Sequence, residues 1–200
     1  MTNRFGSYFL LKVSIAYIFI LSIFVSLTFA RDENEQSIKI GAQAPKFILK
    51  DADDNEFNLE KIFEKDKDNP KIIILIIGNH TTRANGNKWA RELDKIYKDR
   101  NDVVMYMIAD LRGLPFFVTE SMVKWGTKKE NLPITILLDW KGKISEAYKT
   151  RKGESNIFII DNSLKIRHYL FGEYTPKLMN ILIQEVKVYV KNDEKSEIRN

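Results

Sequence analysis

The stretch Ile72–Ile77, which reads IIILII, decides the fold of this protein. A short, uninterrupted apolar run of mostly β-branched residues is typical of a central strand that is covered on both faces of its sheet. Pro70 lies just before the run and Gly78 ends it, as expected at the ends of a strand. The sequence therefore predicts a buried central strand at this point of the chain.

Further strands are predicted on the C-terminal side of this run. Three of them share its apolar character, namely Val103–Ile108, Ile134–Leu138 and Asn156–Ile160, and they are followed by the more polar stretch Leu164–Phe171. The last two flank the polar residues 161–163, so they are predicted to form a hairpin. Because crossover connections are right-handed, the earlier strands should run parallel, and the hairpin should add an antiparallel edge.

Three helices are predicted, and the first and third of them show apolar residues at spacings of three and four. The first covers about residues 84–100, and its stripe is Trp89, Leu93, Ile96 and Tyr97. The second covers Phe116–Trp125. The third begins at Pro176 after the N-cap Thr175, and its stripe is Leu178, Ile181, Leu182, Val186 and Tyr189. Strands and helices in this order indicate an α/β fold, in which a central mixed sheet has helices on both faces.

Residues 1–30 have the features of a signal peptide. Arg4 and Lys12 make the start basic, residues 13–30 carry no charge, and Thr28 and Ala30 are the small residues expected before a cleavage site. The alternative is an uncleaved membrane anchor, because the apolar run approaches the ~20 residues that span a bilayer. Both alternatives predict an exported protein, which would be periplasmic in a Gram-negative bacterium and otherwise secreted or membrane-anchored.

The chain after residue 30 is predicted to contain a flexible lead (31–37), one domain (38–190) and a charged tail (191–200). Residues 1–30 hold two of the 32 basic side chains and none of the 27 acidic ones, so the remainder carries 30 against 27, a net charge of +3. Basic and acidic residues alternate closely, whereas nucleic-acid binding needs a clustered basic face. We therefore expect no nucleic-acid partner, and contact with a membrane only through residues 13–30 if they are retained.

The absence of cysteine excludes disulfides, thiolate catalysis, iron–sulfur clusters and cysteine-ligated zinc. The chain has two histidines, His80 and His168, which are too few for a histidine-rich metal site. The sequence therefore predicts no metal site and no cofactor.

Two blocks of sequence resemble a known family. Ile40–Leu59 (IGAQAPKFILKDADDNEFNL) is similar to the opening of redoxins, the peroxiredoxin and thiol-reductase branch of the thioredoxin-like superfamily. Leu132–Lys143 (LPITILLDWKGK) and Ile157–Ile166 (IFIIDNSLKI) are similar to the later half of the same proteins. This resemblance implies a thioredoxin-like fold with an N-terminal redoxin hairpin. Gly78–Thr82 and Phe117–Met122 further resemble segments of exported, cysteine-poor redoxin-like proteins of the YtfJ type.

Other residues occupy the position of the family's reactive cysteine. In redoxins this cysteine lies at the start of the long helix, where the helix N-terminus stabilises a thiolate. The resemblance places Arg83–Gly86 (RANG) there, so this chain cannot perform thiol redox chemistry. Reductases face this helix with a loop that contains a cis-proline. We expect that loop at Gly153–Ser155, and Pro133 is the alternative.

The surface around this altered site is the candidate functional surface. It comprises Thr81, Thr82, Arg83, Asn85, Gly86, Glu154 and Ser155. The resemblance implies an envelope protein or peptide as partner, because thioredoxin folds bind extended chains there. The alternative is a small carboxylate or phosphate bound at the helix start by Thr81 to Arg83. An enzyme with non-thiol chemistry ranks last, because no loop offers a nucleophile with a base, and no catalytic residue is proposed.

Overall fold

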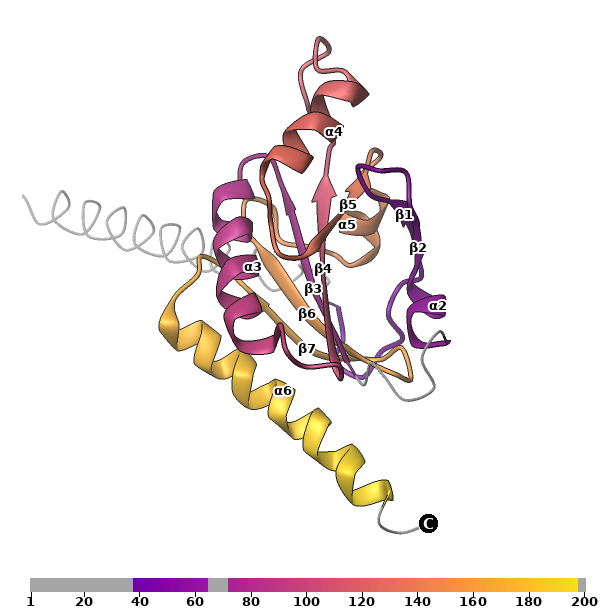
Figure 1. The fold of residues 1–200 in the computed structure, drawn as a ribbon, viewed down its shortest axis with the longest axis vertical. Coiled ribbons are helices and arrows are strands. Elements are labelled where there is room, and N and C mark those ends of the chain that lie inside the picture. The colour runs from indigo at the N-terminus through magenta and orange to yellow at the C-terminus, as the bar shows by residue number, and fades with distance from the viewer. Residues whose placement is uncertain (1–37, 65–71, 198–200) are drawn as a thin grey trace, which may run out of the picture. The chain divides into compact units, whose positions relative to one another are not determined.

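β3 (Ile72–Asn79) lies inside a seven-stranded sheet in the computed structural model, which describes residues 38–64 and 72–197 (Figure 1). The other strands are β1 (Ile48–Lys50), β2 (Glu56–Asn58), β4 (Val103–Asp110), β5 (Thr135–Asp139), β6 (Asn156–Asp161) and β7 (Ile166–Phe171). Their order across the sheet is β2-β1-β5-β4-β3-β6-β7. The predicted central strand therefore lies between β4 and β6.

The strand pairing confirms the predicted mixed sheet. β3 runs parallel to β4, from Ile72 opposite Val103 to Asn79 opposite Asp110. β4 also runs parallel to β5, whereas β6 is antiparallel to both β3 and β7. β1 and β2 form the predicted N-terminal hairpin, and β1 is antiparallel to β5. Because β3 and β4 are parallel and in register, the residues that follow their carboxyl ends gather at one edge of the sheet.

Helices cover both faces of this sheet (Figure 1). They are α2 (Leu59–Glu64), α3 (Arg83–Tyr97), α4 (Glu120–Lys129), α5 (Lys143–Ala147) and α6 (Pro176–Glu197). The even-numbered residues of β3 from 72 to 76 pack with buried side chains of α3 and α6. The odd-numbered residues from 73 to 77 pack on the opposite face with Leu59 of α2 and Ile144 of α5. The period of two along β3 thus creates two apolar layers, as in a thioredoxin-like fold.

The prediction of a helix over Phe116–Trp125 was wrong in its position. The helix is α4, and it begins at Glu120 because the Thr119 hydroxyl caps it by accepting a hydrogen bond from the Met122 backbone N–H at 3.3 Å. The turn after Pro115 leaves Phe116 outside the helix. The short helix α5 was not predicted. It forms because the buried Asp139 carboxylate accepts hydrogen bonds from the first backbone N–H groups of that helix.

The predicted apolar stripes were correct for the residues along the centre of each stripe and wrong for some residues at its edges. Trp89, Leu93 and Tyr97 of α3 are buried, but Ile96 is 41% exposed. In α6 the buried residues include Met179 and Val190, whereas Ile181 is exposed. Thr175 caps α6 as predicted, because its hydroxyl accepts a hydrogen bond from the Leu178 backbone N–H at 3.2 Å.

The N-terminal predictions lie outside the described residues. These are the signal peptide at residues 1–30 and the lead at residues 31–37. Across residues 38–64 and 72–197, no helix is long and apolar enough to cross a membrane. At the other end, α6 continues to Glu197, beyond the position at which the charged tail was predicted to begin.

Gly142, at the turn between β5 and α5, has a left-handed backbone with φ of +62°. The guanidinium of Arg112 lies directly over it, since an added Cβ would be 1.6 Å from Arg112 Nε. From there Arg112 Nη2 donates to Asp110 Oδ2 at 2.6 Å. The absence of a side chain at residue 142 therefore lets Arg112 reach the end of β4.

We predict that Gly142→Ala lowers the free energy of unfolding by about 2–3 kcal/mol, as measured by urea denaturation. About 1 kcal/mol of this loss comes from the left-handed backbone, and the rest from moving Arg112 away from Asp110. Gly113→Ala is the matched control, because Gly113 also has a positive φ but an added Cβ there meets no atom within 4 Å. Equal losses for the two variants would contradict the role given to Arg112.

His168 of β7 is partly buried. Its Nδ1 lies 3.6 Å from Glu185 Oε2 of α6. Burial lowers the pKa of His168 below its ordinary value of 6.5, and the smaller effect of Glu185 opposes that shift. As the pH falls, the unfolded chain therefore takes up this proton before the folded one does.

The lowered pKa of His168 makes a contribution to the free energy of unfolding that depends on pH. We predict that this contribution is fully present above about pH 6.5 and is lost as the pH falls below that value. Urea denaturation is measured at pH 7.5 and at pH 5.5. Between these two pH values, the free energy of unfolding should fall less for His168→Gln than for the unmodified protein. His80→Gln is the control, because His80 lies exposed in a turn, and it should keep the full loss. An unchanged loss in His168→Gln would show that another group is responsible.

Candidate functional site

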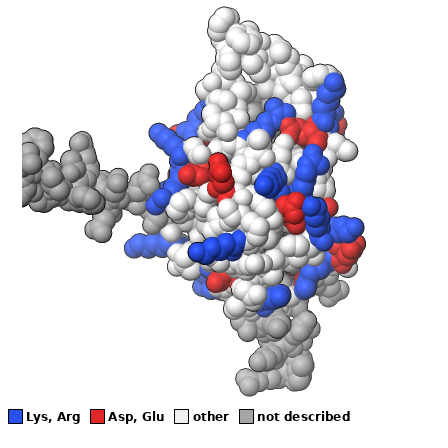
Figure 2. Space-filling model, turned by 90° about the vertical axis from the view of Figure 1, so that its left-hand side faces the viewer, with Lys and Arg blue, Asp and Glu red and all other residues white. Residues whose placement is uncertain are grey.

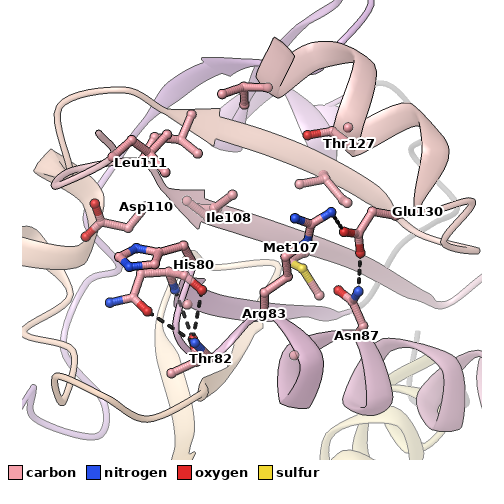
Figure 3. Close-up of a pocket in the computed structure, with 18 of the residues that line it drawn as sticks. His80, Thr82, Arg83, Asn87, Met107, Ile108, Asp110, Leu111, Thr127 and Glu130 are labelled. Atoms are coloured by element: carbon pink, nitrogen blue, oxygen red, sulfur yellow. Dashed lines mark hydrogen bonds and ion pairs between the residues drawn. The ribbon is translucent and has the colours of Figure 1, made fainter. Parts of the chain in front are cut away.

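A cavity of about 260 Å³ lies at the carboxyl ends of β3 and β4, where α3 begins (Figure 3). We call it the α3–α4 pocket. Its apolar lining comes from three places, namely the sheet (Ile76, Met107, Ile108, Ile136), the segment after β4 (Leu111, Leu114, Val118) and α4 (Met122, Val123, Gly126). The pocket is therefore mostly apolar, although it lies next to a helix N-terminus.

One wall of the α3–α4 pocket is polar. Glu130, directly after α4, pairs with Arg83 and accepts a hydrogen bond from Asn87 Nδ2. Figure 3 shows Arg83 and Asn87 reaching from α3 toward this carboxylate. The Glu130 side chain is only 8% exposed, whereas that of Arg83 is 58% exposed. The buried negative charge is thus matched by one positive charge, and the two side chains join α3 to α4.

The helix α4 is attached to the domain at its surface. None of the residues of this fully described helix is buried. Lys124 Nζ lies 2.7 Å from Asp54 Oδ1, Lys128 pairs with Asp53, and Glu130 pairs with Arg83. The hydrogen bond from Lys124 lowers the pKa of Asp54. Three ion pairs thus attach α4 and the residue after it to the rest of the protein, in addition to the packing of Val123 on the core.

The polar groups of the turn before α3 form hydrogen bonds with one another. The Thr81 hydroxyl donates to Asn79 Oδ1 at 2.7 Å, and the Thr81 backbone N–H donates to the same oxygen at 3.0 Å. Thr82 is buried, and its hydroxyl accepts from the Asn79 backbone N–H at 3.0 Å. Both hydroxyls thus stabilise the turn. Because Arg83 is also paired with Glu130, these three side chains are less available to bind an anion than the sequence predicted.

Asn85 connects α3 to two loops. Its Nδ2 donates to Ser155 Oγ at 2.8 Å and to the Gly172 carbonyl at 2.9 Å. Its Oδ1 accepts from the Tyr174 backbone N–H at 2.7 Å. Ser155 is fully buried beneath α3 and directly precedes β6, the neighbour of β3. The loop that faces the start of α3 is therefore residues 153–155, whereas Pro133 precedes β5, on the far side of β4.

A second hollow, of about 210 Å³, lies on the other side of the end of β3. Its charged residues include Asp110, Arg112 and Glu154. Burial acts to raise the pKa of Asp110, but hydrogen bonds from Arg112 and Ser145 outweigh it, so the pKa of Asp110 is lowered. Arg112 also pairs with Glu146. Asp110 and Arg112 are therefore already paired with each other, and the lining also carries Arg151, Lys152 and Glu154.

The structure divides the candidate surface predicted from the sequence into four groups. Thr82, Arg83 and Gly86 line the α3–α4 pocket, and Glu154 lines the second hollow. Asn85 and Ser155 are bonded to each other between these regions, while Thr81 lies exposed on the turn. The seven residues thus come from one neighbourhood but do not form one continuous binding surface.

The residues of α4 and of the segment before it were not among the candidate residues predicted from the sequence. Four large apolar side chains are exposed there, with exposed fractions of 100% for Phe116, 64% for Phe117, 53% for Met122 and 61% for Trp125. We call these four residues the apolar rim. Figure 2 shows few charged side chains at the end of the molecule where α4 lies in Figure 1. The clustering of large apolar residues in the sequence was the available signal, but the segment was interpreted only as a helix.

No cluster of three or more metal-ligating side chains occurs among residues 38–64 and 72–197. His80 is at the edge of the α3–α4 pocket, and Asp110 is the acidic residue next to it there (Figure 3). These two residues are too few for the closed ligand set of a structural metal site.

Comparisons with known proteins agree with this geometry. The model of the AhpC/TSA family matches residues 40–169. No curated protein sequence matches the chain. Among solved structures, the thioredoxin domain of a thiol-disulfide oxidoreductase from Bacteroides vulgatus is similar, with a TM-score of 0.55 and 17% identity over 74% of this chain and 98% of that one. A peroxiredoxin-like protein from Aquifex aeolicus is similar with a TM-score of 0.53 and 14% identity, over 74% and 88% of the two chains. At these identities the two structures support the fold alone.

We predict that Asn85→Ala lowers the free energy of unfolding by about 2–4 kcal/mol, because it removes three hydrogen bonds at partly buried groups. Urea denaturation measures this loss. Asn101→Ala is the control, since Asn101 is exposed in a turn, and it should change the stability by less than about 0.5 kcal/mol. Similar losses in both variants would show that Asn85 does not connect the loops to α3.

Proposed function

Because the chain belongs to the AhpC/TSA family and contains no cysteine, we propose that it is a non-enzymatic protein that binds a protein or peptide partner at the α3–α4 pocket. Peroxidase and disulfide-exchange reactions of such proteins need a sulfur nucleophile. This chain has Arg83 to Gly86 at the start of the long helix instead. A binding role, which needs the fold and its surface but no thiol, fits a chain without cysteine.

The apolar pocket with the apolar rim beside it is the observation that carries this proposal. Monomeric soluble proteins rarely expose several large apolar side chains next to an open cavity, and such surfaces are typical of binding sites. Leu114, Val118 and Met122 line the cavity, and the rim residues Phe116, Phe117 and Trp125 belong to the same segments. A partner that covers the rim would remove this apolar surface from water.

Export is part of the same proposal. Residues 1–30 have the pattern of a signal peptide or an anchor, and the resemblance to YtfJ-type proteins points to the same compartment. The partner would then be an envelope protein or peptide.

The alternative of a small carboxylate or phosphate has less support. The hydroxyls of Thr81 and Thr82 bond within their turn, and Arg83 pairs with Glu130. An anion would have to compete with the Glu130 carboxylate for Arg83. The candidate residues also include no nucleophile next to a general base, so a non-thiol enzyme has the least support.

Site-specific photo-crosslinking in the native cell tests the proposed function. A photoreactive residue at Met122, which is exposed at the edge of the pocket, should give a discrete protein or peptide adduct. The same residue at the exposed Lys187 of α6 is the remote control and should not give that adduct.

A second variant shows whether the pocket itself is used. Gly126→Leu should abolish the Met122 adduct, because Gly126 lines the pocket and an added Cβ there meets no atom within 4 Å, so the longer side chain has room to enter the pocket. Leucine is also a better helix former than glycine, by about 0.6–1 kcal/mol, so this variant should fold. Equal adducts from Met122 and Lys187, or no adduct from Met122 in a well-exported protein, would overturn the proposal.

A further inference from the structure

We propose that the partner polypeptide crosses the carboxyl ends of β3 and β4, with an apolar side chain in the α3–α4 pocket and a carboxylate in the second hollow, next to Lys152. An acidic side chain or the C-terminus of the partner can supply this carboxylate. The inference rests on the proposed function and specifies what the partner must present at two neighbouring positions.

The two cavities are direct neighbours. Gly78, Asn79 and Asp110 line both the α3–α4 pocket and the second hollow. Asn79 lies opposite Asp110 in the last residue pair of the parallel ladder between β3 and β4. A chain that crosses this pair therefore reaches both cavities. Because an extended chain advances by at most about 3.3–3.6 Å per residue, the apolar side chain and the carboxylate should lie only a few residues apart in the partner.

The two cavities differ in their chemistry. The α3–α4 pocket has mostly apolar walls, and its volume of about 260 Å³ is ample for one large apolar side chain. In the second hollow Asp110 is paired with Arg112, and the other charged residues of the lining are Arg151, Lys152 and Glu154. These are two basic side chains against one acidic one. The second hollow is therefore suited to a group with a negative charge.

Lys152 is the basic group in the hollow that is open to a ligand. Its side chain is exposed, and it forms no ion pair with any residue of the described part of the chain. The Oε2 atom of Glu154 lies toward the residue after β7, since an added Cβ at Gly172 would be 4.0 Å from it. The segment that forms this side of the hollow, residues 141–154, holds five basic and two acidic side chains. The surroundings of Lys152 thus favour an anion over a cation.

Asn79 offers a hydrogen-bond donor between the two cavities. Its Oδ1 accepts from the backbone N–H groups of Thr81 at 3.0 Å and Thr82 at 3.3 Å, which fixes the oxygen toward the turn. Nδ2 has no acceptor among the described residues. In that part of the chain only Asn87 Oδ1 and the Tyr97 hydroxyl are buried without a partner, so Asn79 Nδ2 is accessible to solvent. It is therefore placed to donate to a backbone carbonyl of a crossing polypeptide.

The loop that carries Lys152 is held in place before any ligand arrives. The buried Asn156 side chain donates from Nδ2 to the Arg151 carbonyl at 3.1 Å and to the Glu154 carbonyl at 2.9 Å. Its Oδ1 accepts from the Arg151 backbone N–H at 2.8 Å. A loop that is already bonded at both ends loses little conformational entropy when a partner binds.

Selection from a random heptapeptide library tests the two-part ligand on the exported protein. The library is used in an amidated form and in a form with free C-termini. Enriched amidated peptides should combine a large apolar residue with an aspartate or glutamate a few residues away. Enrichment in the free form alone, without acidic side chains, would identify the C-terminus as the source of the carboxylate. Gly126→Leu, which fills the α3–α4 pocket, should remove the preference for the apolar residue.

A reversal of charge tests the second hollow. Lys152→Glu should weaken the binding of an enriched peptide about tenfold in a fluorescence anisotropy titration, because repulsion replaces attraction. Selection on this variant should enrich lysine or arginine in place of the acidic residue. Lys187→Glu is the matched control, since Lys187 is equally exposed on α6 and lines neither cavity, and it should keep both the affinity and the preference.

Asn79→Asp tests the donor between the cavities. The aspartate keeps an oxygen for the N–H groups of Thr81 and Thr82, so thermal unfolding should not begin at a lower temperature. It replaces Nδ2 by an acceptor, so an enriched peptide should bind about fivefold more weakly, as expected for one lost hydrogen bond. A peptide analogue with asparagine in place of its acidic residue should show the same loss, which distinguishes it from charge repulsion.

Each other outcome overturns a defined part of the inference. Enriched peptides without an acidic residue or a free carboxylate overturn the role of the second hollow, and so do equal effects of Lys152→Glu and Lys187→Glu. Unchanged binding in Asn79→Asp overturns the bond at Asn79 alone. The absence of any enriched peptide, with the Met122 adduct retained, overturns a linear polypeptide across β3 and β4 but leaves the proposed function. Loss of both overturns the two together.

Discussion

The side chains of Ile72 to Ile77 alternate between the two faces of the sheet, and each is almost completely buried. Both faces of β3 must therefore be covered, and the order of the chain determines what covers them. α3 follows β3 directly and packs on one face with α6, while α2 and α5 pack on the other. The start of α3, which contributes to the candidate site, is fixed by this burial. Substitutions at the start of α3 are tolerated only if they leave the two apolar layers intact.

Where related enzymes keep a reactive thiol, this chain has a set of side-chain hydrogen bonds. Thr82 closes the turn after β3, Asn85 joins α3 to the loops before β6 and after β7, and Asn87 reaches Glu130. These hydrogen bonds stabilise the fold at the position where related enzymes carry out thiol chemistry. They hold the first two turns of α3 in place, and they leave the apolar pocket beside them open. A pocket wall that is already held in place suits binding, because little conformational entropy is lost there when a partner enters.

The sequence predicted the sheet well because its strands are short apolar runs with clear ends. It predicted the neighbourhood of the site because the family resemblance places residues 83–86 at the start of the long helix. It could not predict that Arg83 pairs with Glu130, since this contact depends on where α4 lies in space. It also misplaced α4 itself. Phe116 and Phe117 have the composition of a core segment, and only the structure distinguishes apolar residues that are buried from those that face solvent.

The attachment of α4 has a consequence for the environment in which the pocket works. The sheet wall of the pocket is held by buried apolar side chains, whereas the α4 wall has no buried residue and is held by Val123, which packs on the core, and by ion pairs with Asp53, Asp54 and Arg83. Exposed ion pairs weaken as ionic strength rises, because salt screens the attraction between their charges. The pairs with Asp53 and Asp54 are exposed, so a rise in ionic strength should loosen this attachment of α4 before it affects the sheet wall.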